Sequence, residues 1–382
     1  MKRRRNSLWH GCVIMMAVVL PAMWSGCAEA PTRSSGEGPP PLAQPAQPSA
    51  PSSAGDSKWQ QTFAAGKAAA EAGRDAEAER ALQAALGMAR EGGGQDMRLT
   101  ESLTQLGEFY LARQRESQAE PLLAEALPLW EKLAGPADAQ TATTLNNLGV
   151  IYQKQKRYGD AEPLYRRALA IWEKASPDQR DQVRVLKNLA VLYRAQGRWV
   201  EAEARYKELI VKREKAVGPD HPDILDALQS LTGLYRLQGK MADAAQIQQR
   251  VVQIKARMSG SDGQGMGKEL IDLAMLQFAQ GRYAEAEALL RQALAQQERT
   301  LGPEHLTVGK TVHKLAELAA EQDNIEQGAP LYHRALSIYE KALGPTHPDM
   351  TRLTKEYVTM LRRAHRDADA DRLEAGIKDG RR

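Results

Sequence analysis

The segment KRYGDAEPLYRRAL at residues 156–169 recurs without a gap as GRWVEAEARYKELI at 197–210, GKMADAAQIQQRVV at 239–252 and GRYAEAEALLRQAL at 281–294. Each copy holds an alanine at its sixth position, and the same column continues in both directions along the chain. Successive members of the column are 41 or 42 residues apart, a regularity that indicates a repeat array. The small residues of this column are Ala78, Ala119, Ala161, Ala202, Ala244, Ala286, Gly328 and Ala370.

Each unit contains a second apolar pattern before the one quoted above. It reads LNNLGVIY at 145–152, LKNLAVLY at 186–193, LQSLTGLY at 228–235 and LIDLAMLQ at 270–277. Apolar residues three and four apart line one face of a helix. The sequence therefore predicts two amphipathic helices per unit, joined by a Gly-Arg-Tyr type of turn.

These two patterns resemble the tetratricopeptide repeat family. The small residue that the family places in the first helix matches Gly66, Gly107, Gly149, Ala190, Ala274 and Ala316, and its tyrosine one turn later matches Tyr110, Tyr152, Tyr193 and Tyr235. The resemblance implies an all-α fold, a right-handed α-solenoid of about eight helix hairpins over residues 58–379. We expect repeats near 58–92, 97–135, 138–176, 179–218, 221–259, 264–302, 305–344 and 347–379.

The 42-residue period is similar to the kinesin light chain type of this family, with a longer second helix and a connector. The connectors read GPDHPD at 218–223, GPEH at 302–305 and GPTHPD at 344–349, and glycine followed by proline ends a helix. One histidine recurs in each, namely His221, His305 and His347. We expect these histidines to make local hydrogen bonds in the turn.

The first residues have the layout of a secretory signal: four positive charges, then an apolar run over residues 11–20 that is too short to span a membrane. WSGC at 24–27 resembles the bacterial lipobox, with Trp24 where an aliphatic residue is usual. The resemblance implies a signal peptide over residues 1–26, a lipid on Cys27 and sorting to the outer membrane, facing the periplasm. Ordinary secretion, after cleavage beyond Ala30, and an uncut anchor are the alternatives.

Residues 31–57 are rich in Pro, Ser and Ala, which predicts that residues 27–57 are a lipidated N-terminus and a disordered linker. Residues 1–26 hold four of the 52 basic residues and no acidic residue, so the remaining chain has 48 of each. This balance argues against nucleic acid as a partner. Of the two cysteines, Cys12 would be removed with the signal peptide and Cys27 would carry the lipid, so we expect no disulfide.

In the family the first helices line the concave groove, and an asparagine at the positions of Asn147 and Asn188 holds the backbone of a bound peptide. An amide offers both a donor and an acceptor to a peptide group. A basic groove for an acidic segment is a further hypothesis, while a solvated polar face with scattered charge is the alternative interpretation. The candidate groove residues are Asn146, Asn147, Arg184, Lys187, Asn188, Arg194, Arg236, Lys268, Lys310 and Lys314, with His313 beside them.

The sequence shows no phosphate-binding glycine loop, metal-type cysteine pair or nucleophile elbow. We therefore expect no enzyme, no cofactor and no metal, and a membrane-tethered scaffold that binds a protein or peptide. A module that binds the cell wall and a periplasmic chaperone that holds client proteins are the competing functions.

Overall fold

The computed structural model describes residues 54–91, 96–175, 179–259 and 265–378, all of them in helices or the short turns between helices. No strand occurs in these residues. The helices are α1 (Ala54–Glu71), α2 (Asp75–Glu91), α3 (Met97–Ala112), α4 (Glu116–Leu133), α5 (Ala139–Lys154), α6 (Tyr158–Ala175), α7 (Gln179–Ala195), α8 (Trp199–Val217), the 3-10 helix η1 (Pro222–Ile224), α9 (Leu225–Leu237), α10 (Met241–Ser259), α11 (Gly267–Phe278), α12 (Tyr283–Leu301), α13 (Leu306–Glu321), α14 (Ile325–Leu343), α15 (Pro348–Arg363) and α16 (Asp367–Lys378).

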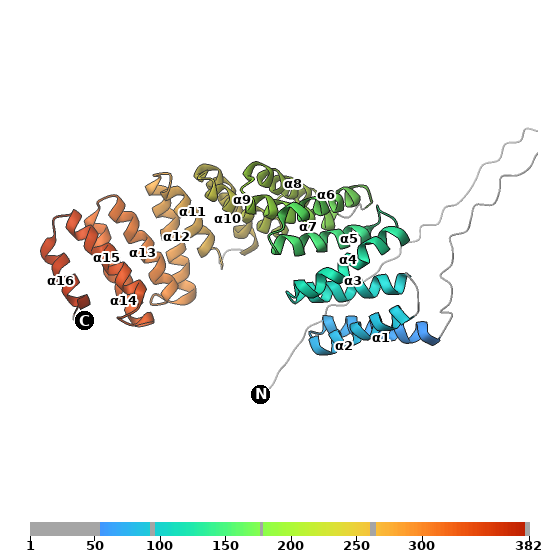
Figure 1. Cartoon of the computed structure of the whole chain (residues 1–382). Coiled ribbons are helices and arrows are strands. Elements are labelled where there is room, and N and C mark those ends of the chain that lie inside the picture. Colours follow the sequence, from blue (N-terminus) through green and yellow to red (C-terminus); the bar gives the residue numbers. More distant parts are fainter. Residues whose placement is uncertain (1–53, 92–95, 176–178, 260–264, 379–382) are drawn as a thin grey trace, which may run out of the picture. The chain divides into compact units, whose positions relative to one another are not determined.

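The helices pair as hairpins in chain order, α1 with α2 through to α15 with α16, and each hairpin packs on the next (Figure 1). The second helix of one hairpin contacts the first helix of the following one. Several successive first helices also touch directly, as α3 touches α5 and α13 touches α15. The solvent-facing sides of the odd-numbered helices are called the first-helix face below. The predicted all-helical array of repeated hairpins is confirmed.

The small-residue column lies where the two helices of a hairpin cross. Every alanine of the column is fully buried, and Gly328 is buried too. The glycines of the first helices lie against side chains of the second helices. A Cβ atom on Gly149, for example, would lie 2.7 Å from Cε1 of Tyr165. A side chain at this crossing would push the helices apart, which explains why the sequence keeps these positions small.

A polar clamp of glutamate and tyrosine joins the second helix of a hairpin to the next repeat at three junctions in the first half of the array. Glu162 on α6 accepts a hydrogen bond of 3.1 Å from the hydroxyl of Tyr193 on α7 and one of 2.6 Å from Nη1 of Arg198. The Arg198 guanidinium also lies 4.3 Å from the centroid of the Tyr193 ring. Glu79 and Glu203 contact Tyr110 and Tyr235 in the same way.

The glutamates of the clamp lie between repeats and not on a solvated helix face. The Glu162 side chain is only 18% exposed, because it lies between two repeats rather than on an open surface. Burial raises the pKa of Glu162, but the hydrogen bonds from Arg198 and Tyr193, together with the charges of Arg198 and Arg166, hold the pKa below its usual value.

The connector histidines act as helix N-caps. The backbone N–H of Asp223 donates to Nδ1 of His221 at 3.2 Å, and His305 and His347 accept equivalent bonds from Thr307 and Asp349 at 3.1 Å. The local turn role expected for these histidines is confirmed. They fix where the first helix of a repeat begins, and so the register of its solvent-facing side.

Candidate functional site on the first-helix face

The ten candidate groove residues all lie on odd-numbered helices. Asn146 and Asn147 lie on α5, and the α7 residues are Arg184, Lys187, Asn188 and Arg194. Arg236 lies on α9, Lys268 on α11, and Lys310 and Lys314 on α13. The apolar residues of these helices are buried on the opposite side, so helical periodicity places nine of the ten on the first-helix face, whereas Asn146 is buried beneath it.

A row of side-chain amides runs across three hairpins on this face. Nδ2 of Asn188 donates to Oδ1 of Asn146 at 2.9 Å, and Nδ2 of Asn146 donates to Oδ1 of Asn147 at 3.3 Å. Asn147 in turn donates to Oε1 of Glu108 on α3 at 3.0 Å. Burial raises the pKa of the Glu108 carboxyl. Asn146 is 2% exposed, so it holds Asn188 in place while Asn147 and Asn188 remain half-buried at the surface.

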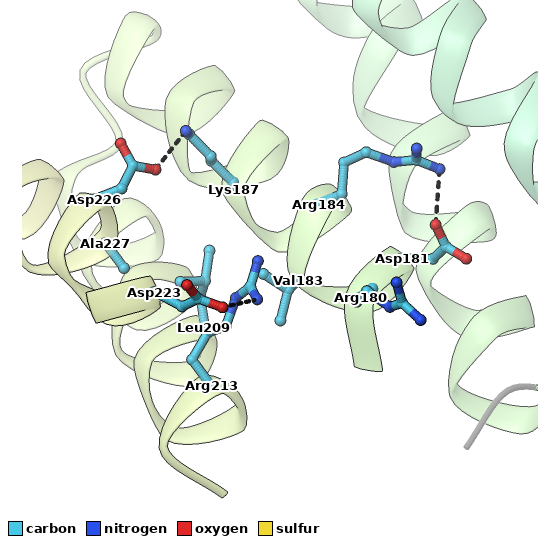
Figure 2. A pocket seen from close by; sticks show the side chains of 10 residues that line it. All are labelled: Arg180, Asp181, Val183, Arg184, Lys187, Leu209, Arg213, Asp223, Asp226 and Ala227. Carbon is cyan, nitrogen blue, oxygen red and sulfur yellow. Dashed lines mark hydrogen bonds and ion pairs between the residues drawn. The ribbon is translucent and has the colours of Figure 1, made fainter. Parts of the chain in front are cut away.

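A pocket of about 600 Å³ opens beside this row, between α7, α8 and α9 (Figure 2). Two of the candidate residues line it. Lys187 pairs with Asp226 at 2.5 Å, and Arg184 pairs with Asp181 at 3.0 Å. The pocket is lined by Arg180, Asp181, Val183, Arg184, Lys187, Leu209, Arg213, Asp223, Asp226 and Ala227, so cations outnumber carboxylates by one.

The remaining cations of the face differ from those in the pocket. Lys314 pairs with Glu317 at 2.7 Å. Four others make no ion pair with any residue in the described part of the chain. Burial raises the pKa of Asp272, and the nearby charges of Lys268 and Arg236 lower that pKa by a smaller amount. These four, the unpaired cations, are Arg194, Arg236, Lys268 and Lys310.

His313 has two acidic partners, of which the sequence alone indicates one. Its Nε2 atom lies 2.5 Å from Oε2 of Glu356 and 3.2 Å from Oε1 of Glu317. Glu317 follows one turn later on the same helix, a spacing visible in the sequence. Glu356 lies on α15, one repeat further on, and only the register between hairpins reveals it.

Within the described ranges, none of the helices is long and apolar enough to cross a membrane. A scan of curated protein sequences finds no match to this chain.

Solved structures with a similar helical array include TPR-like repeats of the kinesin light chain type from Podosopora anserina, at 23% identity and a TM-score of 0.46 over 53% of this chain and 96% of that one. BtubC (BKLC) from P. vanneervenii matches at 18% identity and a TM-score of 0.46, over 62% of this chain and 93% of that one. A tetratricopeptide repeat protein from Parabacteroides merdae matches at 17% identity and a TM-score of 0.45, over 78% and 98%.

Family models give the assignment. A tetratricopeptide repeat model matches residues 96–174, 179–257 and 269–327, more than half of the chain, and a second one matches residues 309–349. Proteins with this fold are typically non-catalytic and commonly bind protein or peptide partners. With its hairpins stacked at a 42-residue period and the matched segments following one another along the array, this chain belongs to the tetratricopeptide repeat family.

Proposed function

We propose that this chain is a non-enzymatic scaffold that binds an acidic, extended segment of a partner protein along the first-helix face. The observation that carries the proposal is the set of unpaired cations, Arg194, Arg236, Lys268 and Lys310. Three of them are exposed and one is half-buried. Guanidinium and ammonium groups that lack an internal partner are available to carboxylates of a ligand, and arginine pairs with them in a bidentate way.

The amide row supplies the second contact that such a segment needs. Oδ1 of Asn188, at the end of the row, accepts no hydrogen bond from any described residue, so it can accept one from a backbone N–H of the ligand. Because Asn188 is already oriented by Asn146, little side-chain freedom is lost on binding. The pocket beside Arg184 and Lys187 has room for a side chain of the same segment.

The test is binding of a fluorescent Glu- and Asp-rich peptide, compared with its Gln and Asn counterpart, to the full chain in mild detergent. Exposed ion pairs contribute roughly 0.2–1 kcal/mol each, so reversing two cations should weaken binding about tenfold. The variant is Arg236→Glu with Lys268→Glu. Its matched control is Lys174→Glu with Lys215→Glu, two exposed lysines on second helices that make no ion pair with described residues.

We expect the acidic peptide to bind more tightly than the neutral one, with added salt weakening it. Equal binding of the two peptides, or equal loss in both double variants, would contradict the proposal. Retention of the chain on purified cell wall, unaffected by the reversal at Arg236 and Lys268, would support the cell-wall module instead.

We further propose that the chain is exported and tethered to the outer membrane by a lipid on Cys27, with residues 27–53 as a spacer. Residues 54–57, which the sequence assigned to the linker, instead form the first turn of α1. Cys27 and the rest of the spacer lie outside the described residues, and the proposal rests on the lipobox-like WSGC segment alone. Metabolic labelling with a fatty acid should mark the wild type and Cys12→Ala but not Cys27→Ala. Label retained in Cys27→Ala, or absent from the wild type, would contradict the tether.

A further inference from the structure

A histidine and two glutamates converge where the seventh hairpin meets the eighth. His313 and Glu317 lie one turn apart on α13, and Glu356 lies on α15. One ligand atom from each of the three, an imidazole nitrogen or a carboxylate oxygen, lies within 4.8 Å of the other two. This cluster is distinct from the unpaired cations and from the amide row.

The imidazole is held firmly in this orientation. His313 is 1% exposed, and its ring lies edge-on to Tyr339 at 6.1 Å between centroids and beside Tyr332 at 6.2 Å. Its Nε2 atom points at the two carboxylates, at 2.5 Å from Glu356 and 3.2 Å from Glu317. A preformed nitrogen donor aimed at two carboxylates requires little rearrangement to bind a cation.

The spacing of the three atoms suits a small divalent ion. Zinc binds imidazole nitrogen and carboxylate oxygen at about 2.0–2.2 Å with tetrahedral angles, which separates neighbouring ligand atoms by about 3.4 Å. The separation of His313 from Glu317 is close to this value, and the Glu356 carboxylate must move outward by about 1 Å. Glu356 is one-third exposed, so its side chain has room to move.

The cluster has an open side. A cavity of about 310 Å³ is lined by Glu317, Glu356 and Tyr332, and by Glu321 one turn further along α13. Tyr332 is 2% exposed, yet its hydroxyl makes no hydrogen bond with any residue that the structure describes. Tyr332 thus borders the same cavity as the three carboxylates.

The same three columns of the repeat carry different residues elsewhere. Between the second and third hairpins they hold Thr104, Glu108 and Asn147, which form an ordinary hydrogen bond from Asn147 to Glu108. Among the described junctions, the seventh with the eighth is the one that places a histidine and two carboxylates together. The arrangement is therefore not a by-product of the repeat pattern.

Two cations already lie near the carboxylates. Lys314 contacts Glu317 at 2.7 Å and Arg352 lies 3.9 Å from Glu356. Both side chains are long and more than one-third exposed, so each can swing into solvent when a doubly charged ion enters. Imidazole with carboxylate is a donor set for a first-row transition ion rather than for calcium or magnesium, which prefer oxygen alone.

We propose that His313, Glu317 and Glu356 bind a divalent transition cation of the zinc class, which ties the seventh hairpin to the eighth. Tyr332 lines the open side, where water or a carboxylate would complete the coordination. No motif pointed to this site in the sequence, because Glu356 is separated from His313 by 43 residues.

The experiment is calorimetric titration of Zn²⁺ into the full chain in mild detergent, with Cys12→Ser and Cys27→Ser as the background because thiolates also bind zinc. We expect one bound ion per chain. His313→Gln and Glu356→Gln should each weaken binding at least about tenfold. Glu321→Gln is the matched control, since it lies on the same helix and cavity but outside the cluster, and it should bind as the background does.

A second readout separates binding from folding. Co²⁺ should give the visible absorption of a four-coordinate site in the background and in Glu321→Gln but not in Glu356→Gln, and Zn²⁺ should raise the melting temperature of the same two proteins. Should His313→Gln fail to fold, the partly exposed Glu356 provides the test. Absence of zinc binding in the background protein, or undiminished binding in a folded Glu356→Gln variant, would overturn the proposal and leave the cluster as an ion pair between hairpins.

Discussion

Replacing Tyr193 by phenylalanine removes a single hydroxyl from the clamp between the third and fourth hairpins. That hydroxyl donates to Glu162 at 3.1 Å and accepts from Arg166 at 3.2 Å. A hydrogen bond to a charged group contributes about 1.5–3 kcal/mol. Glu162 keeps its contacts with Arg198 and Arg166, so we expect a loss at the lower end, about 1.5 kcal/mol.

The array itself offers the matched control. Tyr152 occupies the same column one repeat earlier, but its hydroxyl makes no hydrogen bond with any residue in the described ranges, and its ring is covered by Arg157 at 4.0 Å. Tyr152→Phe should therefore change the free energy of unfolding by less than about 0.5 kcal/mol. The pair isolates the hydroxyl, because both substitutions remove one oxygen and keep the ring.

The assay must be local as well as global, because repeat arrays need not unfold in one step. Amide hydrogen exchange of α7 and α8 reports local opening, and a loss of about 1.5 kcal/mol should speed exchange there roughly tenfold. Urea unfolding followed by circular dichroism gives the global value. Combining Tyr193→Phe with Glu162→Gln should cost less than the sum of the two changes. Equal effects of Tyr193→Phe and Tyr152→Phe would refute the clamp.

Three further outcomes follow from the packing. Gly149→Val should lower the melting temperature in a thermal scan, since any side chain there meets Tyr165 at 2.7 Å and overpacking costs about 1–3 kcal/mol; an unchanged value would mean that the crossing is loose. Burial raises the pKa of Glu162, but the hydrogen bonds from Arg198 and Tyr193 and the charges of Arg198 and Arg166 together lower it by more in the folded chain. The stabilisation from Glu162 is therefore present above about pH 4.5 and is lost as the pH falls through the folded pKa. The fall in melting temperature on acidification should be shallower in Glu162→Gln than in the wild type; identical profiles would contradict this. His347→Ala removes the N-cap of α15 and should lower the free energy of unfolding in urea by about 1 kcal/mol. An equal loss in His365→Ala, which replaces a surface histidine that caps no helix, would count against this role.

The fold could be predicted from the sequence because its determinants are local and repeated. The spacing of Ala161, Tyr165 and Ala168 already places them on one helix face, and all three are fully buried. The connector histidines were predictable for the same reason, since His221 and its donor Asp223 are two residues apart. Contacts within one turn or one hairpin need no knowledge of how hairpins stack.

Contacts between repeats were missed because they depend on register. Glu162 and Tyr193 are 31 residues apart, and nothing within either helix shows that they meet. Comparing the columns of Glu162 and Tyr193 along the repeats does suggest this contact. Where the fifth repeat has Ala245 in place of the glutamate, the sixth has Gln277 in place of the tyrosine. Both partners are lost together at this junction, whereas the sixth repeat keeps Glu287 although the seventh has Ala319 in place of the tyrosine.

Site-specific cross-linking tests most directly whether the first-helix face binds the partner. A photo-activated cross-linking amino acid at Gln229, exposed on α9, places the probe on the first-helix face, and the same residue at Lys215, exposed on α8, places it on a second helix. With the labelled acidic peptide, we expect cross-links from position 229 that unlabelled peptide competes away, and none above background from position 215. Equal cross-linking from both positions, or cross-linking from position 215 alone, would contradict the claim that the first-helix face binds the partner.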